Sequence, residues 1–223
     1  MPNGVDTMEI ETDVKFWADL VSRYVHLPTF RVIDTQSSHG RYSKVPKQIT
    51  VIDLIKFHGH GCDGLFRGAY ALSVGLKALF HQEPIDRTDL RFLSRNSPCL
   101  GDVGEYLTGG RIRFNTQDVR DRAGVWYIIQ RISNKDAVEV VEEADFFDPE
   151  ITKHESGLAN LRDQELSQAI SDLKKMQDSW IIDTLLPSIP EEHYYASRVD
   201  FEWKDVPYSH IGNRTDIILK DVR

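Results

Sequence analysis

Cysteine is scarce in this 223-residue chain, which has only Cys62 and Cys99. Two cysteines are too few for a small fold held together by disulfides, so we expect a reducing compartment. Each thiol is then a candidate for chemistry as well as for a bridge. Because 40% of the residues are hydrophobic, a chain of this length can fill a core without covalent cross-links.

The chain also has fewer basic than acidic residues, 27 Lys and Arg against 35 Asp and Glu, so its formal net charge is −8. A protein that binds nucleic-acid phosphates needs a basic face, so we expect no nucleic-acid partner. The sequence contains no apolar run of membrane-spanning length, and its first residues are acidic where a signal peptide is basic. We therefore expect no membrane partner and a cytoplasmic protein.

The sequence has no internal repeat and no glycine-serine linker, and its apolar pattern predicts an α+β fold. We expect an antiparallel or mixed sheet packed with a central buried helix at 64–80. Residues 1–148 are predicted to form this core domain, and residues 149–223 a helical extension with an aromatic-rich tail that completes a dimer or a pocket. Further helices are expected around 16–24 after a cap at Thr12 or Asp13, at 51–57 after Thr50, and from Pro98 to Gly109. Strands are expected at 30–33, 90–93, 111–114, 125–132 and 138–144. We also expect a polar loop at 34–46 and a solvent-exposed face of glutamates at 139–143.

The stretch "FHGHGCDG", residues 57–64, carries two imidazoles and a thiol on alternate positions between glycines. Imidazole and thiolate are good ligands for zinc or a similar divalent ion, and glycine permits a tight turn between them. Three protein ligands with one open position are typical of catalytic zinc, whereas a structural site has a fourth protein ligand. The predicted ligands are His58, His60 and Cys62, and the candidates for a fourth are Cys99, Asp102, His193 and His210.

Other interpretations of these residues stay open. Cys62 at the start of a helix would have a lowered pKa and, with a histidine as base, could be a nucleophile without any metal. The spacing H-x-H-x-C is not a common zinc-finger pattern, and loop histidines and cysteines also serve in packing or capping. Cys99 alone is typical of a buried inert thiol. Gly109 and Gly110 could bind an anion through their amides or simply end a helix.

Two blocks of the sequence resemble a known family. "FHGHGCDGLFRGAYAL" resembles the H-G-H-x-C-P-G signature of the FmdE family, which is named for formylmethanofuran dehydrogenase, and "NSPCLGDVGEYLTGG" resembles the second block of that family. The resemblance covers roughly residues 50 to 145. It implies an α+β core, an intertwined homodimer and a metal-associated pocket around the first block. Carried over position by position, it points to His58, His60 and Cys62 in the first block and to Cys99 and Asp102 in the second.

Two departures from the family pattern matter. Asp63 stands where the family usually has proline, and no cysteine follows Cys99, so the C-terminal zinc finger of some relatives is absent. The family name does not establish an enzyme activity, because function depends on the site.

Our hypothesis is a homodimeric metal-binding protein whose zinc-like ion is open to a small molecule, with a non-catalytic sensor or assembly partner as the alternative. The glycine-flanked helix and the aromatic tail offer more apolar surface than one core needs, which also favours a dimer. We expect the tail to close over the motif. The candidate residues are His58, His60 and Cys62 for the metal, Cys62 and Asp102 for catalysis with Asp63 as another proton carrier, and Cys99, Gly109, His193 and Tyr194 for the pocket.

Overall fold

The structure is a computed structural model that describes residues 6–35, 43–110, 112 and 115–204. Its helices are α1 (Asp6–Val21), α2 (Val51–His58), α3 (Asp63–Phe80), η2 (Arg87–Asp89), α4 (Pro98–Thr108), α5 (Pro149–Leu158), α6 (Asp163–Trp180), the π-helical η4 (Ile181–Leu185) and α7 (Pro190–His193). Its strands are β1 (Thr29–Asp34), β2 (Ser43–Thr50), β3 (Ile85–Asp86), β4 (Leu90–Arg95), β5 (Gln117–Arg120), β6 (Trp126–Arg131), β7 (Ala137–Glu142) and β8 (Tyr194–Arg198).

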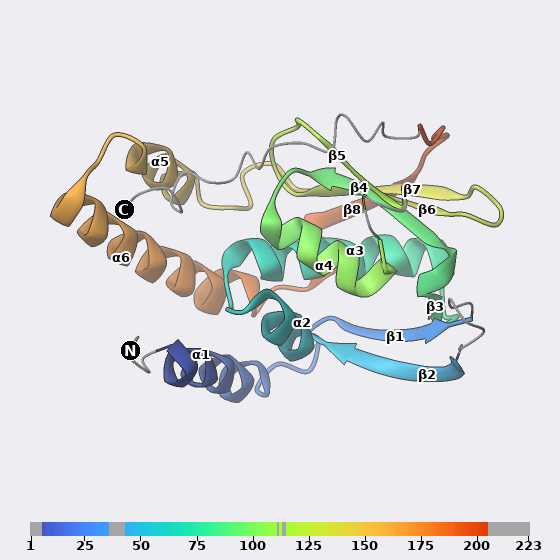
Figure 1. Ribbon diagram of the computed structural model, residues 1–223, viewed down its shortest axis with the longest axis horizontal. Helices are drawn as coiled ribbons and strands as arrows, with labels where there is room; N and C mark the ends of the chain where they lie inside the picture. The colour runs from blue at the N-terminus through green and yellow to red at the C-terminus, as the bar shows by residue number, and fades with distance from the viewer. Residues whose placement is uncertain (1–5, 36–42, 111, 113–114, 205–223) are drawn as a thin grey trace, which may run out of the picture.

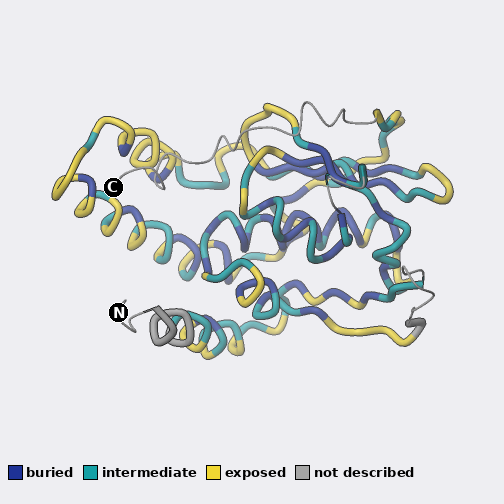
Figure 2. The backbone as a smooth tube through the Cα atoms, viewed as in Figure 1, coloured by how far each residue is buried: buried dark blue, intermediate teal, exposed yellow. Residues whose placement is uncertain are grey.

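Helix α3 is the centre of the molecule. Its apolar stripe, from Leu65 through Leu72 to Leu79, is almost completely buried. In Figure 1, α3 runs between the five-stranded sheet and the three-stranded sheet, and Figure 2 shows it as one of the most deeply buried elements. A Cβ at Gly75 would lie 2.8 Å from Ile129 Cδ1, so glycine is needed for α3 to approach β6 this closely. The predicted central buried helix is therefore confirmed.

The larger sheet has the strand order β5-β4-β6-β7-β8 and is mixed, because β4 and β5 are parallel while the other neighbours are antiparallel. The smaller sheet has the order β2-β1-β3. Together with the helices, these sheets confirm the α+β fold. Strand β8 pairs Tyr194 with Glu142 of β7, so the C-terminal region contributes a strand to the main sheet. The domain boundary at residue 148 stays a prediction.

Several local expectations differ from the structure. Strand β2 occupies part of the expected loop at 34–46, and β5 was not expected. Residues 45–48 of β2 are exposed, so this edge strand is held by its pairing with β1 and needs no apolar alternation that a sequence could reveal. Helix α1 begins at Asp6, before the expected caps. The strand expected at 111–114 falls mostly outside the described residues. Ile112, the one described residue of this stretch, lies in a 3-10 turn.

No helix within the described parts of the chain combines the length and the apolar character needed to cross a membrane.

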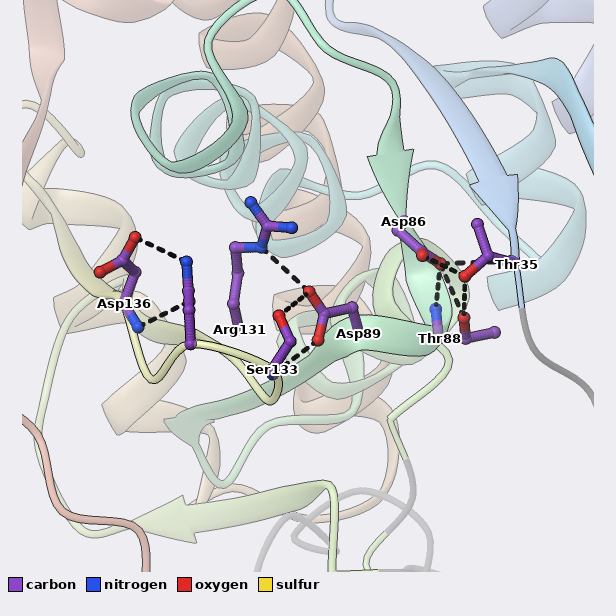
Figure 3. Close-up of polar contacts among 8 residues, drawn as sticks. Thr35, Asp86, Thr88, Asp89, Arg131, Ser133 and Asp136 are labelled. Atoms are coloured by element: carbon purple, nitrogen blue, oxygen red, sulfur yellow. Dashed lines mark hydrogen bonds and ion pairs between the residues drawn. The ribbon is translucent and has the colours of Figure 1, made fainter.

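Two aspartates secure the connection between the sheets (Figure 3). The Asp86 carboxylate at the end of β3 accepts hydrogen bonds from the backbone N–H of Thr88 at 3.0 Å and its hydroxyl at 2.7 Å. It also accepts one from the hydroxyl of Thr35, directly after β1. Asp89 similarly accepts hydrogen bonds from the backbone N–H and hydroxyl of Ser133, in the β6–β7 hairpin. These contacts join three loops near the ends of both sheets.

We expect Asp86→Ala to lower the free energy of unfolding by about 1–2 kcal/mol near neutral pH, as the loss of a helix cap does. Burial opposes ionisation of this carboxyl, but the hydrogen bonds from Thr35 and Thr88 outweigh it and lower the pKa of Asp86. An acid whose pKa is lower in the folded state stabilises the fold above its unfolded pKa, near 3.9, and this contribution is lost as the pH falls below that value.

Urea unfolding at pH 7 and pH 3 measures this effect, with Asp121→Ala at an exposed position as the control. The difference between Asp86→Ala and wild type should shrink at pH 3. An equal difference at both values would contradict a role for the charged carboxylate.

Candidate metal centre

Helix α2 carries His58 to the site at its C-terminal end. The helix begins directly after its N-cap, Thr50, whose backbone N–H and hydroxyl donate to the Asp53 carboxylate at 2.9 and 2.8 Å, as in a capping box. It ends at Gly59, which adopts a φ of 99°, a conformation that favours glycine, and whose N–H donates to Ile55. His58 is therefore the last helical residue before a sharp turn in the chain.

The two cysteines lie at the starts of two other helices. Cys62 is the N-cap of α3, and Cys99 follows Pro98 in the first turn of α4. The helix starts meet at Gly64, where a Cβ would lie 2.9 Å from the Cβ of Cys99 and 3.0 Å from its Sγ. Glycine at this position thus allows the two thiols to touch.

Three donor atoms converge where these helix ends meet. His58 Nε2 lies 3.7 Å from Cys62 Sγ, and Cys62 Sγ lies 3.6 Å from Cys99 Sγ. All three donors lie within 4.8 Å of one another. A tetrahedral zinc site with bonds of about 2.3 Å to sulfur and about 2.0 Å to nitrogen separates sulfur from sulfur by about 3.8 Å and sulfur from nitrogen by about 3.5 Å. The donor atoms therefore fit a zinc-like ion.

Asp102, one turn along α4 from Cys99, orients the imidazole. Its Oδ2 lies 2.7 Å from His58 Nδ1. A carboxylate only accepts hydrogen bonds, so Nδ1 carries the proton and Nε2 faces the thiols. Burial lowers the pKa of His58, but hydrogen bonds with Cys99 and Asp102 outweigh burial and raise it overall. A carboxylate behind a ligating histidine is the usual support of a metal site.

The two thiols differ in acidity. The pKa of Cys62 is raised, mainly by the hydrogen bond between Cys62 and Cys99 and next by burial. Hydrogen bonds with Cys62 and His58 lower the pKa of Cys99 to about 5 despite burial. This order favours Cys99 as the first thiolate, whereas the sequence pointed to Cys62 as the nucleophile.

His60 lies beside the group of three donors and is not part of it. Its ring lies against that of His58, with 4.5 Å between the centroids. Burial lowers the pKa of His60, and the neighbouring His58 lowers it further. The geometry thus places Cys99 where the sequence motif placed His60, and ligation by His60 stays a prediction.

The remaining predicted pocket residues do not join the three donors. Gly109 ends α4 at the opposite end from Cys99, with a φ of 67°. His193 Nδ1 lies 2.7 Å from Glu143 Oε2, and its ring stacks on Phe146. The buried Tyr194 donates its hydroxyl to Glu142 at 2.9 Å. His210, one candidate for a fourth ligand, lies outside the described residues.

A buried ion network lies beside the site and was not predicted from the sequence. Arg67 donates to Glu142 Oε1 at 2.8 Å and to Asp63 Oδ2 at 3.2 Å, and its guanidinium lies 3.7 Å from the centre of the Phe147 ring. The expectation of a solvated glutamate face is wrong for Glu142, whose side chain is 6% exposed. Through Glu142, the network joins Asp63, next to Cys62, to Tyr194. The i,i+4 spacing of Asp63 and Arg67 was the one available sequence signal.

The hairpin of α5 and α6 borders the site. Glu155 on α5 is exposed, but the protein around it reduces its hydration. This desolvation raises the pKa of Glu155, and the charge of Asp63 raises it further. Lys174 on α6 contributes to the low pKa of His60. Both residues therefore lie within electrostatic reach of the motif. In Figure 1 the hairpin extends to one side of the core, with the C-terminal end of α6 leading back toward it.

Fold and site together define an α+β protein with a histidine and two cysteines gathered at three helix ends. Residues 57–192 match the FmdE family, described as "Molybdenum formylmethanofuran dehydrogenase operon", and the chain belongs to this family. Among solved structures, it is similar to a tungsten formylmethanofuran dehydrogenase FmdE-like protein from Syntrophus aciditrophicus. That likeness has 12% identity and a TM-score of 0.42, and covers 69% of this chain and 74% of the other. A search of curated proteins found no match.

Proposed function

We propose that this protein binds a zinc-like divalent ion through His58, Cys62 and Cys99. The observation that carries the proposal is the spacing of the donors, 3.6 Å between the two sulfurs and 3.7 Å between Cys62 Sγ and His58 Nε2. Two thiolates and one imidazole are ligands that suit zinc, and one nitrogen and two sulfurs leave a fourth position in a tetrahedron. Asp102 would hold the imidazole in the ligating orientation.

The same geometry supports a site that is open to a small molecule. A bound ion with a free position would supply Lewis acidity or an activated water. If His60 instead completed the coordination, the site would be closed and a sensor or assembly role would be favoured. The small-molecule ligand, the homodimer and the cytoplasmic location stay predictions.

The direct test is elemental analysis of protein purified without added metal, followed by titration of the chelator-treated protein with Co²⁺. We expect one ion per chain and an intense sulfur-to-cobalt absorption band. Addition of small ligands such as azide should change the Co²⁺ spectrum if the fourth position is open, and leave it unchanged if the site is closed. A protein that retains no metal and takes up neither Zn²⁺ nor Co²⁺ would contradict the proposal.

A thiol-based site without metal is the second candidate. It is favoured by the contact between the two thiols and His58 and by the lowered pKa of Cys99. The metal titration separates the two candidates, because only a metal site takes up Zn²⁺ or Co²⁺, and labelling of the thiols adds a further test. Metal-free protein whose Cys99 reacts with iodoacetamide faster than Cys62 would support the thiol candidate.

A further inference from the structure

Helix α1 lies outside the part of the chain that matches the family, yet it contacts the motif directly. The backbone N–H of Gly61, between His60 and Cys62, donates to the Asp13 carboxylate at 2.9 Å. The matched region begins at residue 57, so this contact joins an element outside it to the loop between two candidate ligands. Figure 1 shows α1 beside α2, the helix that carries His58.

Trp17, one turn further along α1, covers the same glycine. A Cβ at Gly61 would lie 2.1 Å from Trp17 Nε1, so no other residue fits at this position unless the indole moves. The indole is fully buried and packs on Phe66 of α3, with 4.9 Å between the ring centroids. Among the described residues, Trp17 Nε1 has no hydrogen-bond partner. Burial of an unpaired N–H is unfavourable, so packing of the indole must compensate for this penalty.

We infer that Asp13 and Trp17 are positioning residues that hold the Gly61 backbone and thereby keep Cys62 and His58 at metal-binding distance. The inference rests on the proposed function. Glycines on both sides of His60 give the loop more backbone freedom than other residues would, and ordering such a loop lowers metal affinity unless it is ordered beforehand. Asp13 fixes the Gly61 backbone through a hydrogen bond, and Trp17 packs against the same glycine.

The test compares Zn²⁺ dissociation constants of full-length variants by competition with a chromophoric chelator. Asp13→Ala should weaken binding about 10-fold or more, in the range seen when outer partners of a metal site are removed. Asp13→Asn keeps an oxygen acceptor and should restore most of the affinity. Asp19→Ala, at an exposed position on the same helix, is the matched control and should bind like wild type.

Amide hydrogen exchange of the metal-free proteins provides a second readout. A peptide covering residues 59–64 should exchange faster in Asp13→Ala than in wild type or Asp19→Ala. Wild-type protein that binds no zinc would reject the proposed function itself. Wild-type protein that binds zinc, with an Asp13→Ala variant of equal affinity, would reject the positioning role alone, whatever the exchange rates.

Discussion

Cys99→Ser is expected to weaken Zn²⁺ binding by more than the roughly 10–100-fold that follows loss of an outer partner, because it removes a donor atom itself. Serine has nearly the same shape as cysteine, so the metal-free variant should keep the wild-type fold and unfolding midpoint. Cys62→Ser should have a comparable effect, since the two sulfurs lie side by side, 3.6 Å apart. The dissociation constant for Zn²⁺ and the intensity of the cobalt–thiolate band measure the loss.

His60→Ala is the matched control, because it separates the ligand set of the sequence motif from that of the structure. The three donors that converge are those of His58, Cys62 and Cys99, so His60→Ala should weaken binding only slightly. If His60→Ala weakened zinc binding as much as Cys99→Ser, the motif's own set of ligands would be correct and the geometric assignment wrong.

Arg67→Met should lower the free energy of unfolding by about 3–5 kcal/mol, the usual consequence of breaking a buried ion pair. The change leaves Asp63 and Glu142 as buried carboxylates without their cation, and both side chains are at most 11% exposed. Burial already raises the pKa of Asp63 in spite of the opposing charge of Arg67. Urea unfolding monitored by circular dichroism measures the change.

The variant's dependence on pH has a definite sign. Without Arg67, the folded-state pKa of Asp63 should rise further above its unfolded value, so the folded state binds more protons and stability falls as the pH rises through that range. Arg67→Met should therefore lie closer to wild type at pH 5 than at pH 7. Adding Glu142→Gln should recover part of the loss, because it removes one of the unpaired charges.

Arg122→Met is the control for a surface ion pair. Arg122 pairs with Glu139, and the two side chains are 48% and 27% exposed. Its loss should change the free energy of unfolding by no more than about 1 kcal/mol. If Arg67→Met destabilised the protein no more than Arg122→Met, the buried network would not be a major source of stability.

Tertiary packing accounts for the features of the site that the sequence did not reveal. Cys62 and Cys99 are 37 residues apart, and their contact depends on the close approach of α3 and α4 at Gly64. The burial of Glu142 depends on Arg67, 75 residues away, and on the position of β7 over α3. No local pattern distinguishes Glu142 from a solvated glutamate on an alternating strand.

Interactions between residues that are close in the chain explain the elements that could be predicted. Thr50 before α2, Pro98 and Gly109 at the two ends of α4, and the apolar stripe of α3 act within a few residues along the chain, so these elements could be predicted with nearly correct bounds. The two sequence blocks likewise indicated the family, which the match over residues 57–192 confirms. Only the tertiary structure shows which donors come together: Cys99 lies with His58 and Cys62, and His60 lies outside this group of three. A donor set depends on side-chain directions at the ends of separate helices, and only the packing of those helices determines these directions.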